Sequence, residues 1–122
     1  MINRPSNKEL QKRLTEAKAA ISQGRKAVEN LFSLIEDLND FGYLMKDFTQ
    51  LLPDILEEVK PRHYAGQRPP ASAYASQIRG KELWAFSWKS KIVGCEVYFK
   101  FAFKDDMLWI VSFHKSRPRS GE

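Results

Sequence analysis

The 122-residue sequence predicts one α+β domain, in which N-terminal helices pack on one face of an antiparallel sheet of three or slightly more strands. Two patterns predict this class. Apolar residues recur at helical spacing up to about residue 60, and they alternate with polar residues beyond residue 80. The expected order is a helical part over about residues 6–60, a loop over 61–80, the sheet over 81–115 and a basic tail over 116–122.

The net charge of +5 is distributed unevenly between these parts. Residues 1–59 carry 8 basic and 10 acidic side chains, a net charge of −2, whereas residues 60–122 carry 12 basic and 5 acidic ones, a net charge of +7. The sheet half of the chain is therefore the part that would attract an anionic partner such as a nucleic acid.

Three helices are predicted in the first part. The first begins at Ser6, where S-N-K-E has the spacing of a capping box, and ends at Gly24. The second is expected over residues 26–38, with a buried apolar stripe formed by Val28, Leu31, Phe32, Ile35 and Leu38. The third covers residues 45–59, and Pro53 is expected to break it into two pieces because its ring clashes with the preceding turn and it has no N–H.

The loop over residues 61–80 contains proline and glycine and is long for a compact domain, and loops of this kind tend to be functional or mobile. Three strands follow it, over residues Leu83–Lys89, Cys95–Phe103 and Met107–Lys115. In the first strand the alternation places Trp84, Phe86 and Trp88 on one face, and core packing is the favoured interpretation of these rings.

The last two strands are expected to join through a three-residue turn, Lys104–Asp106, which pairs Phe103 with Met107. On the face toward the helices this register sets Phe101 opposite Trp109, Phe99 opposite Val111 and Val97 opposite Phe113. On the other face it sets Tyr98 opposite Ser112, Glu96 opposite His114 and Lys100 opposite Ile110. A two-residue turn would instead reverse every side chain of one strand.

Several classes of protein are excluded by what the sequence lacks. No apolar run approaches the roughly 20 residues that span a bilayer, and the N-terminus has no apolar stretch of a signal peptide, so we expect a cytoplasmic protein. Cys95 is the single cysteine and cannot form an intramolecular disulfide, and His63 and His114 are too few for a structural zinc site. We therefore expect neither a metal nor another cofactor.

Tyr98, Lys100 and His114 are the residues that point to chemistry, because each can move a proton or hold a phosphate group and the expected register puts all three on one face. An exposed sheet face with ordinary polar residues would give the same pattern, and this alternative stays open. The aromatic residues of the first strand are interleaved with Lys81, Lys89 and Lys91, an arrangement in which the lysines can follow the phosphates of single-stranded RNA.

The stretch V-Y-F-K (Val97 to Lys100), followed by a strand that ends in V-S-F-H (Val111 to His114), resembles the C-terminal hairpin of the MqsR family, small RelE-like toxins of type II toxin–antitoxin systems. The order of the preceding motifs is similar to that family. Phe41-Gly42 matches its turn, Lys60 to Gly66 matches K-P-x-x-Y-x-G, and Leu83 to Phe86 matches L-W-x-F.

The resemblance implies an endoribonuclease that cleaves single-stranded mRNA without a metal and is inhibited by a cognate antitoxin. The reactive tyrosine of the family falls on Tyr98 and its lysine on Lys100, and His114 with Lys115 resembles the S-F-H branch. The other active-site residues of the family lie in the middle loop, where Arg62, Tyr64 and Arg68 are candidates by neighbourhood.

An RNase of this kind removes the proton of the 2′-hydroxyl, stabilises the charge on the phosphorane and protonates the leaving 5′-oxygen. Histidine is the residue type whose ordinary pKa lies nearest neutrality, so His114 is the candidate general acid or base, with Glu96 expected to orient it. Lys100 suits charge stabilisation, and Tyr98 suits hydrogen bonding to the phosphate. Supporting residues are Ser112 and Lys115, and further phosphate ligands are Arg117 and Arg119.

Two other functions stay open at this point. A non-catalytic RNA- or DNA-binding regulator would use the same basic face only to bind phosphates. A protein-interaction adaptor without a nucleic-acid role would be favoured if Tyr98, Lys100 and His114 lay far apart.

Overall fold

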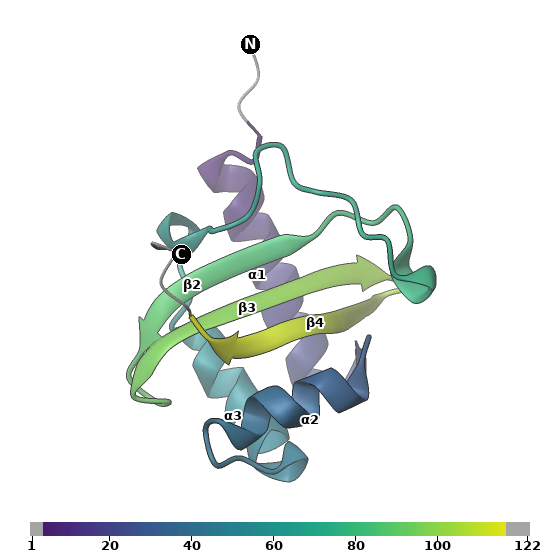
Figure 1. The fold of residues 1–122 in the computed structure, drawn as a ribbon. Coiled ribbons are helices and arrows are strands. Elements are labelled where there is room, and N and C mark those ends of the chain that lie inside the picture. The colour runs from purple at the N-terminus through teal and green to yellow at the C-terminus, as the bar shows by residue number, and fades with distance from the viewer. Residues whose placement is uncertain (1–3, 117–122) are drawn as a thin grey trace, which may run out of the picture.

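A computed structural model describes residues 4–116, and in it helices cover one face of a four-stranded mixed sheet (Figure 1). The helices are α1 (Asn7–Ser22), α2 (Leu31–Asn39) and α3 (Met45–Glu57), with two short 3-10 helices, η1 (Pro61–His63) and η2 (Ser76–Ile78). The strands are β1 (Lys26–Val28), β2 (Trp84–Ser90), β3 (Cys95–Lys104) and β4 (Met107–Lys115). The predicted α+β class is confirmed.

The strands lie in the order β1-β4-β3-β2. The antiparallel meander predicted from the sequence is present in β2, β3 and β4, but β1 pairs in parallel with β4, so an all-antiparallel sheet was the wrong prediction. Figure 1 shows α1 running behind the sheet, and the apolar residues of α1 and α3 form one core with the strand residues that face them. We call this covered side the inner face and the opposite side the outer face.

The first helix agrees with its prediction. Ser6 caps it by accepting a hydrogen bond from the backbone N–H of Glu9 (3.1 Å), and the helix ends at Ser22, just before Gly24. The Glu9 carboxylate does not close a capping box. It binds the Arg4 guanidinium, which also binds Glu82 at 2.8 Å and so ties the N-terminus to the segment that leads into β2.

The predicted second helix over 26–38 is wrong in its first part and in its buried face. Residues 26–28 form β1, and the helix begins only at Leu31 because Asn30 caps it by accepting from the N–H of Ser33 (3.0 Å). The helix buries Leu34 and Leu38 against the core. The predicted stripe is instead largely open to solvent, with Leu31 51%, Ile35 39% and Phe32 85% exposed.

The predicted break at Pro53 is also wrong, because α3 is one helix from Met45 to Glu57. Pro53 removes one backbone hydrogen bond, but it lies on the solvent side, where water can serve the carbonyl that loses its donor. The buried stripe continues across it as Phe48, Leu52, Ile55 and Leu56. Burial of this stripe outweighs the local cost of proline.

The β3–β4 hairpin does not have the predicted register. Its turn has two residues, Asp105 and Asp106, which both adopt positive φ (54° and 64°), as in the tight turns that fit the twist of a hairpin. Near the turn Phe101 pairs with Ile110 and Ala102 with Trp109. A bulge next to Lys100 and Phe101 then shifts the pairing by one residue, so Phe99 pairs with Phe113.

The bulge determines which residues of β4 face the helices. Leu108, Ile110 and Phe113 are buried with the inner face, whereas Trp109 and Val111, which were predicted to lie there, pack on the outer face. The two-residue turn exchanges the faces on which the β4 side chains were predicted to lie. The extra residue Val111 restores the predicted faces beyond the bulge. The inner face is apolar as predicted, although it is built from different pairs.

The loop over residues 61–80 folds along β2 and over part of the outer face (Figure 1). Backbone hydrogen bonds of 2.8 Å join Ala65 to Ala85 and Leu83 to Ala71, so the loop covers the edge of β2. Beyond it, the loop and η2 close over one end of the outer face in a small second core. Its buried residues are Ala73, Ile78 and Ala102.

Candidate functional site

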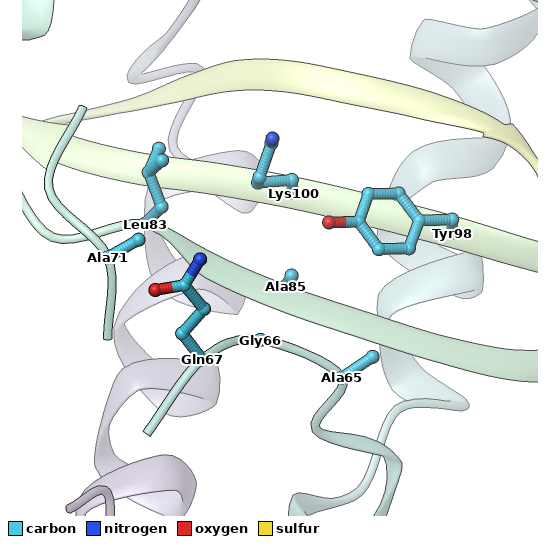
Figure 2. A pocket seen from close by; sticks show the side chains of 8 residues that line it. All are labelled: Ala65, Gly66, Gln67, Ala71, Leu83, Ala85, Tyr98 and Lys100. Atoms are coloured by element: carbon cyan, nitrogen blue, oxygen red, sulfur yellow. The ribbon is translucent and has the colours of Figure 1, made fainter. Parts of the chain in front are cut away.

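The uncovered part of the outer face contains a cavity of about 460 Å³ (Figure 2). One side is formed by β2 and β3, and the other by the loop at residues 65–67 and 71. The lining residues are Ala65, Gly66, Gln67, Ala71, Leu83, Ala85, Tyr98 and Lys100. Figure 2 shows the Tyr98 hydroxyl pointing along β3 toward Lys100 and the Gln67 amide rising from the loop toward the strands.

Two of the three residues that the sequence singled out, Tyr98 and Lys100, line this cavity, and the third, His114, stacks on Tyr98. Tyr98 pairs with His114 rather than with Ser112, and their rings stack with centroids 5.0 Å apart and planes 18° from parallel. Lys100 pairs with Ser112 rather than with Ile110, and it lies two residues from Tyr98 on the same face. A phenol, an imidazole and an ammonium group therefore share one open surface.

The orientation of His114 is determined by a backbone carbonyl. Its Nδ1 lies 2.8 Å from the carbonyl oxygen of Lys115, and since a carbonyl can only accept, Nδ1 carries the proton and donates it. Nε2 is left as the nitrogen that can exchange a proton with a ligand. The expected partner Glu96 is not opposite His114, because the register of β3 and β4 sets Tyr98 there; Glu96 lies opposite Lys89 on β2.

Lys115 contributes through its backbone rather than through its charge. Its ammonium lies 5.8 Å from the centroid of the Phe41 ring, on the helical side of the sheet, and its side chain pairs in register with Val97 of the inner face. Lys100 is therefore the ammonium group that lines the cavity beside the Tyr98–His114 stack.

Tyr98 is half-buried between the strands and the loop, and this burial raises the pKa of its phenol above the ordinary value of 10. At neutral pH the hydroxyl is therefore protonated. It can donate a hydrogen bond to an anion, and it is a poor base.

The other predicted RNA-binding residues lie outside this cavity. Arg62, Lys89 and Lys91 line a second hollow beside η1 and the β2–β3 turn. Tyr64 packs edge-on against the core residue Phe86, and Arg68 lies over the Tyr64 ring and donates to the Pro5 carbonyl. These two residues hold the loop in place. Arg117 and Arg119, with the rest of the predicted tail beyond Ser116, lie outside the described residues.

Among the lining residues that were not predicted from the sequence, Gln67 and Gly66 have specific roles. Gln67 presents its amide to the cavity, and Gly66 lets the loop pass beside the Tyr64 ring, because a Cβ at residue 66 would lie 2.6 Å from the Tyr64 hydroxyl oxygen. The Y-x-G spacing of residues 64–66 was the available signal. This spacing indicates that the tyrosine ring folds back over the glycine two residues later.

Residues 4–116 contain no group of three or more His, Cys, Asp or Glu side chains placed to hold a metal ion. Across the same residues, none of the helices combines the length and the apolar character that crossing a bilayer requires.

A scan against models of protein families gives no match to this chain, and a search of curated proteins gives no matching sequence. The resemblance to MqsR toxins therefore depends on the motifs quoted above and stays a prediction.

Proposed function

We propose that this chain is a metal-independent endoribonuclease that cleaves single-stranded mRNA in the cytoplasm, and that it is the RelE-like toxin of a type II toxin–antitoxin system. The observation that supports cleavage most directly is that His114 stacks on Tyr98, which lines an open cavity together with Lys100. An adaptor function was favoured only if these three residues lay apart, and they do not.

In the proposed reaction the 2′-oxygen of the RNA attacks the adjacent phosphorus and the bond to the 5′-oxygen breaks. The products are a 2′,3′-cyclic phosphate and a free 5′-hydroxyl. His114 Nε2 exchanges one of the two protons that move, and water exchanges the other. Lys100 and the Tyr98 hydroxyl stabilise the additional negative charge on the phosphorane oxygens, by charge and by a hydrogen bond respectively.

The test is cleavage of a labelled single-stranded transcript in the presence of EDTA, with mapping of the product ends. We expect cyclic phosphate and 5′-hydroxyl ends, and a loss of about 10² to 10⁴ in rate for His114→Ala. Tyr43→Phe and Lys12→Ala are matched controls for Tyr98→Phe and Lys100→Ala, because both lie on the helical side. Binding without cleavage would favour the regulator function instead.

A second substrate assigns the proton that His114 moves. In an RNA with sulfur in place of the scissile 5′-oxygen, the thiolate leaves without protonation. If His114 is the general acid, His114→Ala cleaves this substrate nearly as fast as the unchanged protein. If it is the general base, the defect persists.

The proposal also includes an antitoxin, and the exposed face of α2 is the surface that fits it. Leu31, Phe32 and Ile35 form an apolar patch on this helix. The acidic residues around it are Glu29, Glu36, Asp37 and Asp40, and α2 itself has no basic residue. By charge complementarity, the segment that docks here is basic and amphipathic.

Co-expression with the product of the adjacent gene tests this surface. Phe32→Ser is expected to remove inhibition while the free enzyme keeps its cleavage activity. Tyr74→Ser is the matched control, since Tyr74 is as exposed (89%) but lies on the loop near η2. Equal inhibition of both variants would contradict docking on α2.

A further inference from the structure

A second hollow, of about 290 Å³, lies where the end of α3, η1 and the β2–β3 turn meet. It is separate from the cavity at Tyr98. Its lining residues are Glu58, Arg62, His63, Trp88, Lys89 and Lys91. Three cationic side chains from separate segments thus converge on one concave surface.

Glu58 is the acidic residue of this lining, and its carboxylate is already engaged. One oxygen accepts from Trp88 Nε1 (2.9 Å), and the other accepts from the backbone N–H groups of Lys91 (3.0 Å) and Ile92 (3.1 Å). Burial raises the pKa of Glu58, but these hydrogen bonds outweigh that effect and hold it below its ordinary value. Glu58 is therefore an ionised residue that holds the turn in place.

Within residues 4–116 the cations of the hollow, Arg62, Lys89 and Lys91, form no ion pair, although Glu96 is the cross-strand neighbour of Lys89. Three like charges at one concavity, with one engaged carboxylate, favour binding of an anion.

His63 adds a neutral hydrogen-bond donor to this surface. Its Nδ1 accepts from the backbone N–H of Lys60 (2.9 Å), so the neutral ring carries its proton on Nε2. Burial, helped by the neighbouring Arg62 charge, lowers the pKa of His63 and favours this neutral form at pH 7. A phosphate oxygen is the ligand group that suits one such donor among three cations.

We infer that this hollow binds a backbone phosphate of the same RNA strand whose scissile phosphate lies at Tyr98, an inference that rests on the proposed function. Ser87 pairs with Tyr98, and Lys89 and Lys91 lie two and four residues further along the chain. At about 3.3 Å per residue Lys89 is about 7 Å beyond the pair, and Lys91, in the turn that follows β2, is at most about 13 Å beyond it. A stacked strand covers the longer distance in at most about four nucleotides, at about 3.4 Å each.

The inferred contact makes binding depend on strand length. An oligonucleotide of eight nucleotides reaches both sites, whereas one of three nucleotides reaches only the cavity. Each phosphate contact with a single strand contributes about 0.7 to the dependence of log affinity on log salt, or about fivefold in affinity at 0.1 M salt. Loss of the one phosphate contact at this hollow should cost about fivefold.

The experiment measures binding of labelled, fully 2′-deoxy oligonucleotides of three and eight nucleotides, which cannot be cleaved by 2′-hydroxyl attack. We expect Lys89→Ala/Lys91→Ala to weaken binding of the eight-nucleotide strand about fivefold and to leave binding of the three-nucleotide strand unchanged. Lys8→Ala/Lys12→Ala, exposed on α1, is the matched control. An equal effect on both lengths, or no effect on either, would overturn the inference.

Competition with inorganic phosphate separates a strand site from a site for a free anion. We expect inorganic phosphate to displace the eight-nucleotide strand no better from the unchanged protein than from Lys89→Ala/Lys91→Ala, and only through ionic strength. Specific displacement by phosphate at low concentration would overturn the strand assignment. Because no cleavage is measured, length-dependent binding by a protein that fails the EDTA assay would refute the proposed function and not this inference.

Discussion

At the scale of single residues, His114 and Tyr98 receive their properties from different parts of the environment. The Lys115 carbonyl fixes the tautomer of His114, and burial beside the loop keeps Tyr98 protonated. The His114 imidazole can transfer a proton through Nε2, whereas the neutral Tyr98 phenol keeps its proton and can donate a hydrogen bond. This division of roles follows from two contacts and not from the residue types alone.

The buried tyrosines predict a loss of stability at high pH. Burial raises the pKa values of Tyr43, Tyr64 and Tyr98, whereas in the unfolded chain they titrate near 10. Their contribution is complete below pH 10, and the free energy of unfolding falls as pH rises from there toward the folded values, because the unfolded state then binds fewer protons. Denaturant unfolding from pH 8 to 11 measures this.

The slope of the free energy of unfolding against pH shows which tyrosines cause the decrease. Tyr98→Phe is expected to make it shallower, whereas Tyr74→Phe, at a position 89% exposed, should leave it unchanged. The same slope for Tyr98→Phe and the unchanged protein would contradict the role of burial at Tyr98.

Gly66→Ala is predicted to disturb the loop at the cavity. Its Cβ would lie 2.6 Å from the hydroxyl oxygen and 2.8 Å from Cζ of Tyr64, whose ring is held by Phe86 and Arg68. We expect a loss of about 1–3 kcal/mol in the free energy of unfolding, the usual range for overpacking, together with weaker RNA binding. In a Tyr64→Ala background the same substitution should cost almost nothing, and a full cost there would refute the clash.

At the scale of elements, the parts predicted correctly are those with local signals. Ser6 caps α1 as its sequence indicates, and the period of two locates β2, β3 and β4 nearly to the residue. The same alternation placed Tyr98 and Lys100 on one face, so this part of the site was predictable.

What could not be predicted depends on contacts between distant residues. β1 is three residues long and exists because β4 offers it a partner. The bulge at Lys100 and Phe101 shifts the pairing of β3 with β4 by one residue, and no local pattern reveals it. The sequence therefore predicted Glu96 opposite His114, where the structure has Tyr98. The loop covers the outer face through bridges to β2, and these too depend on tertiary contacts.

Pro53 gives a prediction about α3. Because Pro53 is exposed in mid-helix, Pro53→Ala restores a backbone hydrogen bond and loses no buried contact. The expected gain is about 2 kcal/mol in the free energy of unfolding, after allowing for the greater freedom of the unfolded chain. Denaturant unfolding measures it, with Asp54→Ala as the neighbouring exposed control. An unchanged or lower stability would show that α3 already accommodates proline without cost.

At the scale of the whole molecule, Arg4 joins parts that are far apart in the sequence. It binds Glu9 on α1 and Glu82 before β2, while Arg68 of the loop donates to the carbonyl of Pro5. The N-terminal residues thus brace the loop that forms one side of the cavity. The core is formed by the helices and the sheet, and these N-terminal contacts lie outside it.

Arg4→Ala is therefore expected to loosen the loop without unfolding the core. Amide hydrogen exchange should become faster at Ala65 and Leu83, whose N–H groups bond across to residues 85 and 71, and should stay slow at Phe99 in the central strand. Arg25→Ala is the matched control, because its partner Asp106 lies at the β3–β4 turn. Unchanged exchange at Ala65 and Leu83 would show that the loop is stable without the ion pairs of Arg4.

The position of β4 between β1 and β3 has a consequence for synthesis on the ribosome. β1 is translated early, yet its partner begins only at Met107, so the sheet cannot close until that last strand has left the exit tunnel. Tyr98 and His114 come from the two strands that meet last. Under the proposed function, a nascent chain would be unable to cut its own message before translation had passed His114.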